Sequence, residues 1–93
     1  MRIRAIVFTL IISEAQSLKD KRQVILSMIT KLRQKFNISV AEVGCQDQWQ
    51  RAELGLVYLG NQQQYLDSVQ QEIEKLIEEH YPVEITELSV DDY

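Results

Sequence analysis

The sequence predicts an α+β fold of four β-strands and two α-helices. Four short segments are rich in the β-branched and aromatic residues that strands favour. Two longer segments repeat apolar residues every three or four positions, as amphipathic helices do. The chain has 93 residues, of which 45% are hydrophobic and 26% charged, so it can bury a core without disulfides. We therefore expect one domain over residues 1–93.

The first strand is predicted over residues 2–12, and both of its faces are apolar. A strand of this kind belongs in the middle of a sheet, with its second face not fully exposed to water. One face has Ile6, Phe8, Leu10 and Ile12, and the other has Ile3, Ala5, Val7, Thr9 and Ile11.

The first helix is predicted from about Leu18 to Phe36. Ser17 is a suitable N-cap, and Asp20 three residues later makes an acidic variant of the capping box. Asn37 is expected to end the helix as a left-handed cap. Three cations crowd the first turn, where the helix dipole disfavours them, and a local rule broken without structural gain indicates function. These cations are Lys19, Lys21 and Arg22.

A hairpin is predicted from the next two strands, residues 38–43 and 51–59. Its tip spans residues 44–50, which contain the only Cys and the only Trp of the chain. Gly55, inside the second of these strands, indicates a bulge or the close approach of another group to the backbone.

The second helix is predicted to start at a capping box formed by Asn61 and Gln64 and to end before Pro82. The last strand is predicted over residues 83–90. Its apolar positions change phase midway, which indicates a bulge or a poorly patterned edge strand. Residues 91–93 are expected to fray.

This order of elements is the ferredoxin-like βαββαβ arrangement, in which two helices cover one face of an antiparallel sheet with strand order 4-1-3-2. Counting strand directions places three connections at one end of the sheet: residues 13–18, 44–50 and 80–82. Asp47 and His80 would lie near this end. The candidates for RNA or anion binding there are Ser17, Lys19, Lys21, Arg22, Gln46, Trp49, Gln50 and Arg51.

The chemistry of these candidates favours a phosphate or a nucleobase. The free N–H groups of a helix N-terminus bind anions, and neighbouring cations strengthen the binding. Trp49, flanked by Arg51 and by side-chain amides, could stack on a base. The alternatives are that Trp49 packs against the core and that the basic turn is simply solvated.

A second candidate surface is the face of the sheet that the helices do not cover. Left exposed, it would be a larger apolar patch than a monomer usually leaves in water. We expect a homodimer that stacks sheet on sheet there, with coverage by another protein as the alternative. The dimer-face candidates are Ile3, Ala5, Val7, Thr9, Ile11, Val57 and Leu59.

Charge is unevenly distributed along the chain, whose formal net charge is −4. Residues 1–51 contain nine Lys/Arg and four Asp/Glu, whereas residues 52–93 contain one Lys and ten Asp/Glu. This separation indicates a dipolar molecule whose positive side meets an anion. The alternative is that helix surfaces are charged in most proteins.

Several classes of function are disfavoured by the sequence. A single Cys and a single His make a metal site or a catalytic thiol a poor interpretation, and no phosphate-binding loop or catalytic motif is present. The apolar run near the N-terminus is too short to span a membrane and lacks a cleavage site. We expect a cytoplasmic protein with no catalytic residue, no metal and no cofactor.

Two separated motifs resemble the signatures of the YlxP-like family, a small bacterial family of unassigned function. The first is residues 15–22, and the second comprises residues 39–43, 46–47 and 49–52. The resemblance implies the same ferredoxin-like fold in a bacterial cytoplasmic protein, commonly encoded near translation and ribosome-maturation factors. The chain departs from the family pattern at Gly44 and Cys45, where an acidic residue and a His are more common.

Three functional hypotheses follow. The first is a non-enzymatic accessory factor that contacts RNA or a ribosomal particle through two connections, residues 13–18 and 44–50. The second is a protein-interaction or dimerisation module that uses the apolar sheet face. The third is a sensor of a small ligand or anion at the same end of the sheet, which rests on fold analogy alone.

Overall fold

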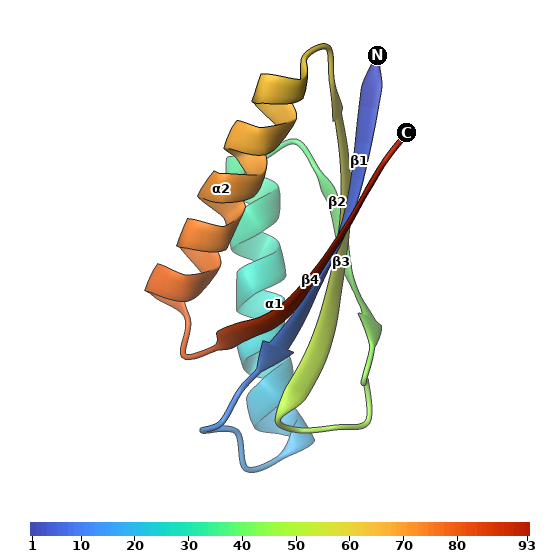
Figure 1. Cartoon of the computed structure of the whole chain (residues 1–93). Helices are drawn as coiled ribbons and strands as arrows, with labels where there is room; N and C mark the ends of the chain where they lie inside the picture. The colour runs from blue at the N-terminus through green and yellow to red at the C-terminus, as the bar shows by residue number, and fades with distance from the viewer.

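The four strands form one antiparallel sheet in the order β2-β3-β1-β4, which is the predicted order read from the opposite edge. The computed structural model describes residues 1–93, and it confirms the predicted ferredoxin-like βαββαβ fold (Figure 1). Neither helix is long and apolar enough to cross a membrane. The elements are β1 (Arg2–Ile11), α1 (Leu18–Lys35), β2 (Ser39–Gly44), β3 (Arg51–Gly60), α2 (Gln63–His80) and β4 (Glu84–Asp92).

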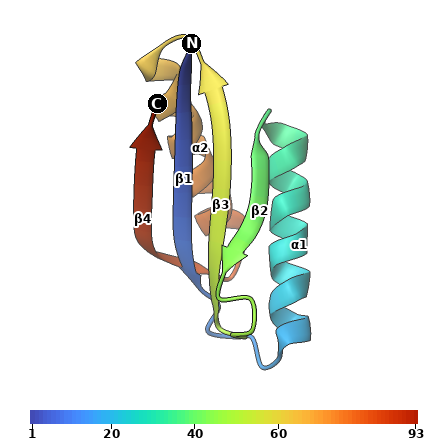
Figure 2. The same ribbon diagram turned by 90° about the vertical axis from the view of Figure 1, so that its right-hand side faces the viewer.

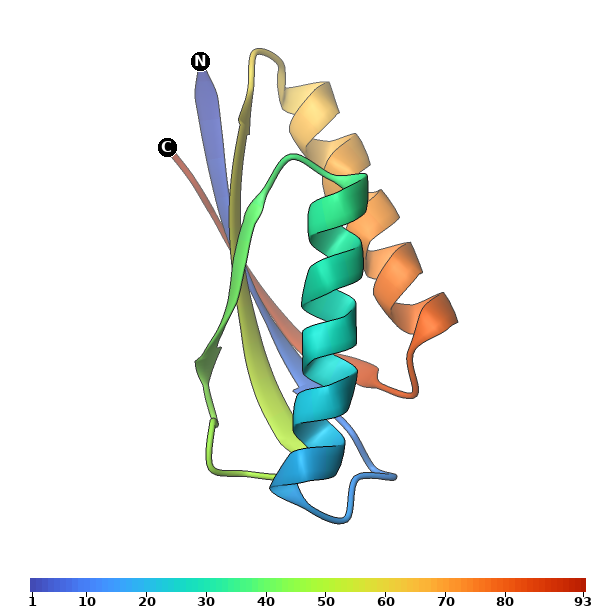
Figure 3. The same cartoon turned by 180° about the vertical axis from the view of Figure 1, so that it is seen from behind.

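Both helices lie on the same face of the sheet, and the opposite face is bare (Figures 1 and 3). The core fills the space between these layers, because the even-numbered residues of β1 and β3 point toward the apolar stripes of the helices. Each large side chain that is fully buried there stabilises the fold by about 1.5–3 kcal/mol. The largest apolar ones are Ile6, Phe8, Leu10, Ile12, Met28, Leu32, Leu54, Leu66, Ile73 and Ile77.

The helix ends agree only in part with the predicted caps. At the start of α1, the Ser17 hydroxyl accepts a hydrogen bond from the Asp20 N–H at 3.1 Å, and the Asp20 carboxylate accepts one from the Gln16 N–H at 3.0 Å. The predicted cap at Asn37 was wrong, because α1 passes into extended backbone at Phe36. The predicted capping box of α2 was also wrong: its N-cap is Gln62, which makes no side-chain cap.

Two bulges interrupt the ladders, and both lie close to predicted irregularities. In β4 the pairing passes from Leu10 with Ile85 to Thr9 with Glu87, so one residue of β4 is extra and the predicted phase change is confirmed. A second bulge follows Glu42 in β2. Nearby, a Cβ on Gly55 would lie only 2.9 Å from Val43 Cγ1, which confirms the predicted close approach.

The C-terminus is paired, so the prediction that residues 91–93 fray was wrong. The Tyr93 N–H donates to the Ile3 carbonyl at 2.8 Å, and the Ile3 N–H donates to the Tyr93 carbonyl at 3.1 Å. Strand β4 therefore follows β1 along nearly its whole length (Figure 2).

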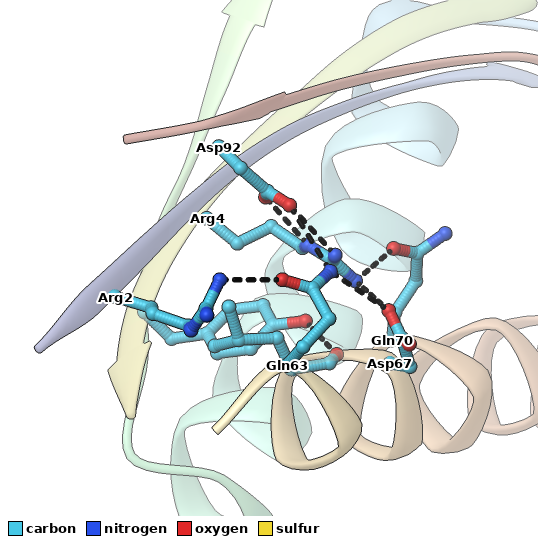
Figure 4. A network of polar contacts seen from close by, with 8 residues as sticks. Arg2, Arg4, Gln63, Asp67, Gln70 and Asp92 are labelled. Carbon is cyan, nitrogen blue, oxygen red and sulfur yellow. Dashed lines mark hydrogen bonds and ion pairs between the residues drawn. The ribbon is translucent and has the colours of Figure 1, made fainter. Parts of the chain in front are cut away.

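A buried arginine joins the end of β4 to α2 (Figure 4). Arg4 is only 4% exposed, and its Nε and Nη2 donate to the two oxygens of Asp92 at 2.8 and 2.9 Å. Its Nη1 donates to Asp67 at 2.9 Å and to Gln70 at 3.0 Å. Gln63, also on α2, donates from its Nε2 to both Asp67 and Asp92. We call these five residues the Arg4 cluster.

Electrostatics within the Arg4 cluster follow from this geometry. The hydrogen bonds from Arg4 lower the pKa of Asp92 from 3.8 to about 2, and the same bonds raise the pKa of Arg4. Burial raises the pKa of the neighbouring Tyr58, whose hydroxyl donates to the Leu66 carbonyl. Arg4 is therefore a satisfied structural cation at the N-terminal end of β1.

Candidate functional site

Two connections meet at the end of the sheet opposite the chain termini (Figures 1 and 2). They are held together by Gln50. Its carbonyl accepts a hydrogen bond from the Ile12 N–H at 2.8 Å, and its Nε2 donates to the carbonyls of Ser13 at 3.2 Å and Ala15 at 3.0 Å. The topology thus brings together two of the three predicted connections, whereas the third, residues 80–82, lies beside the middle of α1. We call residues 13–22 and 45–51 the loop edge.

Lys21 is the internal support of the loop edge. Its side chain is fully buried, and its ammonium donates to the carbonyls of Cys45 at 2.7 Å and Arg51 at 3.2 Å. The same nitrogen lies 2.9 Å from Glu42 Oε2, at ion-pair distance but outside the geometry of a directed hydrogen bond. The expectation that Lys21 meets an external anion was therefore wrong, because the fold already supplies its partners.

Several other predicted candidates also have structural partners. The Ser17 hydroxyl caps α1, and the carboxylate of Asp20 occupies the same helix end, which disfavours a bound anion there. The Gln50 amide bonds the first connection, and Gln46 Nε2 donates to the Glu42 carbonyl at 3.2 Å. The exposed cations that remain in the basic turn are Lys19 and Arg22.

Trp49 is half exposed, so the alternative that it packs into the core was wrong. It lines two hollows. One lies against α1 and is formed with Gln16, Ser17, Leu18 and Asp47. The other is lined by Ile11, Asp47, Gln48, Trp49, Gln50 and Arg51. An aromatic side chain between two hollows is a surface on which a planar group can stack.

Arg51 borders the second hollow from the start of β3. Because it pairs with Ile11 in the ladder, its side chain lies on the bare face of the sheet. Its Nε is buried and has no hydrogen-bond partner. Buried donors are nearly always paired in native structures, so an unpaired one is a feature of the site that needs explanation.

Cys45 and His80, which could have suggested chemistry, do not come together. Cys45 has a left-handed backbone (φ 60°) at a turn in which the Gln48 N–H donates to its carbonyl at 3.0 Å. Its thiol lies 3.8 Å from Glu53 Oε1. After His80, the Tyr81 hydroxyl contacts Ser27 at 3.2 Å, beside the middle of α1 and away from its first turn. No group of three or more metal-binding side chains is present.

The bare sheet face has the apolar character that the sequence predicted. Val57 is 45% exposed and Leu59 is 59% exposed, while Ile3, Ala5, Val7 and Ile11 are half-buried. Val43 was not among the predicted residues, yet it is 56% exposed and lies across Gly55 on this face. Thr9 must be removed from the predicted set, because it is buried beside β4.

The charge separation of the sequence becomes a separation in space. Helix α1 lies over the β2 side and exposes Lys19, Arg22, Lys31, Arg33 and Lys35, whereas α2 and β4 expose most of the acidic residues. The loop edge lies at the N-terminal end of the basic helix. The exposed acidic residues of α2 and β4 are Asp67, Glu72, Glu78, Glu79, Glu84, Glu87, Asp91 and Asp92.

The fold and the loop edge define a small ferredoxin-like α+β protein in which the half-exposed Trp49 and the exposed Lys19 and Arg22 share one end of the sheet. The family described as "Protein of unknown function (DUF503)" matches residues 3–90, and the chain belongs to this family. The uncharacterized protein YlxP of Bacillus subtilis (strain 168) is 48% identical over 46 residues, which are 50% of each chain. The chain thus matches about half the length of this curated relative. These findings confirm the predicted YlxP-like resemblance.

Proposed function

We propose that this protein is a non-enzymatic cytoplasmic accessory factor that binds RNA, or a ribosomal particle, through the loop edge. The observation that supports this proposal is the half-exposed Trp49, which shares a hollow with Ser17 and Leu18 directly before the exposed Lys19. Stacking on an aromatic ring and neutralisation of phosphate by nearby cations are the two interactions that single-stranded RNA requires of a protein surface.

The distribution of charge favours a defined orientation on RNA. The chain is acidic overall, so nonspecific attraction to RNA is weak. Lys19 and Arg22 nevertheless continue along α1 into a basic surface, and the acidic α2 and β4 lie on the other side. Phosphates would therefore contact the exposed side chains of Lys19 and Arg22, and not the capped N–H groups at the start of α1, while a base stacks on Trp49.

The test compares two double variants with the same change in charge. Binding of a fluorescein-labelled single-stranded RNA is measured by anisotropy over a range of salt concentrations. Lys19→Gln/Arg22→Gln should weaken binding several-fold and lower the slope of log affinity against log salt by about one to two. Lys31→Gln/Lys35→Gln, at the other end of α1, is the matched control and should change affinity less.

The anisotropy result has two outcomes that would contradict the proposal. Equal losses in both variants would mean that binding follows net charge and not the loop edge. An unchanged affinity in Lys19→Gln/Arg22→Gln at low salt would exclude these cations from the interface. Co-sedimentation with ribosomal subunits, using the same pair of variants, extends the comparison to the particle.

The bare sheet face favours a second role, a homodimer that stacks two sheets. The supporting observation is the run of exposed Val43, Val57 and Leu59 across two adjacent strands, beside the half-buried Val7 of β1. A second copy would remove this apolar surface from water, which is favourable by about 25 cal/mol for each Å² buried. The outer positions of β4 are charged or polar and would form the rim.

Sedimentation velocity tests the dimer directly. Val57→Glu should convert a dimer into a monomer, because it places a carboxylate in the centre of the face. Leu26→Glu is the matched control: Leu26 is 65% exposed on α1, outside the sheet, and its replacement should leave the association unchanged. A wild-type chain that sediments as a monomer at high micromolar concentration would rule this role out.

A further inference from the structure

The hollow between Trp49 and Arg51 also contains Asp47, whose carboxylate is not explained by phosphate binding. A carboxylate repels phosphate, so its presence is unexpected if the surface binds only phosphates. Arg51 has a buried Nε without an acceptor. A carboxylate and a guanidinium that border the same hollow as an aromatic ring indicate recognition of something more specific than a phosphate.

The hollow is open to solvent and has room for a planar ring system. Its volume is about 530 Å³, within the range of small-molecule sites. It lies on the bare-sheet side of the loop edge, next to Ile11, so it does not overlap the cap of α1. A chain whose phosphates follow Lys19 and Arg22 could therefore place one base across Trp49 into this hollow.

We propose that the hollow recognises a guanine base. Guanine presents two adjacent N–H donors, N1 and N2, on one edge, and these match the two oxygens of the Asp47 carboxylate. On its other edge it presents the O6 and N7 acceptors, to which arginine donates in a bidentate manner. Trp49 supplies the stacking surface. When the Arg51 guanidinium turns toward the base, a guanine acceptor pairs with its Nε, which otherwise has no partner.

The other bases lack this combination of edges. Adenine and cytosine each present a single amino group beside ring acceptors, so a carboxylate meets an acceptor lone pair at the neighbouring position. Uracil has one N–H between two carbonyls. Among the four bases only guanine has paired donors for a carboxylate and paired acceptors for a guanidinium, so the residues of the hollow discriminate by hydrogen bonding and not only by stacking.

This inference rests on the proposed function when the guanine belongs to an RNA chain, but the same chemistry would bind a free guanine nucleotide. The experiment therefore uses two kinds of probe. The first pair is GMP and AMP, followed by quenching of the intrinsic fluorescence of Trp49, the only tryptophan of the chain. The second pair is a uridine heptamer with a central guanosine or a central adenosine, labelled at one end and followed by anisotropy.

Three variants of the 93-residue chain separate the contributions. Asp47→Asn should lower the preference for guanine over adenine by roughly tenfold, the size of one bidentate contact. Arg51→Lys keeps the positive charge but loses the fork, so it should retain affinity for the uridine background and lose preference for guanine. Glu53→Gln removes a nearby carboxylate that does not line the hollow and should keep the preference. Circular dichroism confirms that each variant is folded.

Each outcome decides between the two proposals. A guanine preference that disappears in Asp47→Asn supports the site. Heptamers that bind equally well, and that respond to Lys19→Gln/Arg22→Gln, would overturn the guanine site and leave the RNA-binding function intact. Quenching by GMP without binding of either heptamer would support a nucleotide site and reject the RNA function. No response to any probe would reject both.

Discussion

The two ends of the sheet use the same device, a buried cation that joins two elements, but they differ in what they leave exposed. At the N-terminal end of β1, the Nε, Nη1 and Nη2 atoms of Arg4 all donate hydrogen bonds within the protein, to two carboxylates and an amide. At the other end, Lys21 joins α1 to the hairpin through two carbonyls and Glu42. There Trp49 remains half exposed and Arg51 Nε remains unpaired.

This difference teaches that a buried cation can either stabilise the fold alone or also position neighbouring groups that stay exposed. The Arg4 cluster attaches the edge strand β4 to α2. This matters because the side chains of β4 are almost all exposed and contribute little to the core. Lys21 fixes the backbone at both sides of the hairpin tip and leaves the side chains of the tip free. The four predictions below test this contrast, starting from the largest expected effect.

Removing Lys21 should have the largest effect. In Lys21→Met the side chain keeps its volume, but the Cys45 and Arg51 carbonyls and a Glu42 carboxylate that is 18% exposed lose their cation. We expect a loss of about 3 kcal/mol in the free energy of unfolding, measured by urea denaturation. Trp49 fluorescence should also shift to the red as the loop loosens.

The matched control for this prediction is Lys19→Met, the same change two residues earlier at an exposed position, which should alter stability by less than about 0.5 kcal/mol. The double variant Lys21→Met/Glu42→Gln should recover part of the loss, because it no longer leaves a carboxylate without a partner. Equal stability of the two single variants would show that Lys21 does not support the loop.

Removing Arg4 should cost less, about 2 kcal/mol, because Asp67 and Asp92 are 52% and 38% exposed and can regain water. Hydrogen exchange should locate the loss of protection in β4 for Arg4→Met, with Trp49 fluorescence unchanged. Lys75→Met, at an exposed cation of α2 outside the Arg4 cluster, is the control. Loss of protection in the loop edge instead of β4 would break the contrast between the two ends.

Shortening Gln50 should have a smaller effect, about 1 kcal/mol, because two neutral hydrogen bonds to the Ser13 and Ala15 carbonyls are lost at a partly exposed site. Urea denaturation of Gln50→Ala measures this cost, and Gln48→Ala provides a neighbouring amide as the comparison. If Gln50→Ala keeps full stability but loses RNA affinity, then the Gln50 amide contacts the ligand and its role in the first connection is minor.

The smallest effect concerns pH. The pKa of Asp92 is lowered from 3.8 to about 2, so its ionised form is stabilised in the folded protein. That stabilisation is complete above the ordinary pKa and is lost as the pH falls from about 4 toward 2, because the unfolded chain takes up the proton first. Urea denaturation across this range should show a flatter pH dependence for Asp92→Asn than for the wild type. Parallel curves would contradict the role of Arg4 as its partner.

Part of the candidate site was readable from the sequence, and the errors have a physical origin. The topology correctly placed the basic turn beside the hairpin tip, since strand directions follow from the order of elements. Lys21 was misassigned because its charge outweighed its spacing: it precedes Ile25 by four residues and Met28 by seven, which places it on the buried stripe of α1. Arg4 was overlooked for the same reason, although it shares the inward face of β1 with Ile6.

The amino-acid sequence by itself determined the order of elements, the inward and outward faces of the strands, the bulge in β4 and the close approach at Gly55. These features depend on the periodicity and the backbone freedom of neighbouring residues, which are local properties. Only the tertiary structure decided which polar groups are free. Asp92 reaches Arg4, and Lys21 reaches the Cys45 carbonyl, across separations of 88 and 24 residues, so their pairing depends on the register of the sheet and the position of α1. The groups left without such partners, Trp49 and Arg51 among them, form the surface available to a ligand.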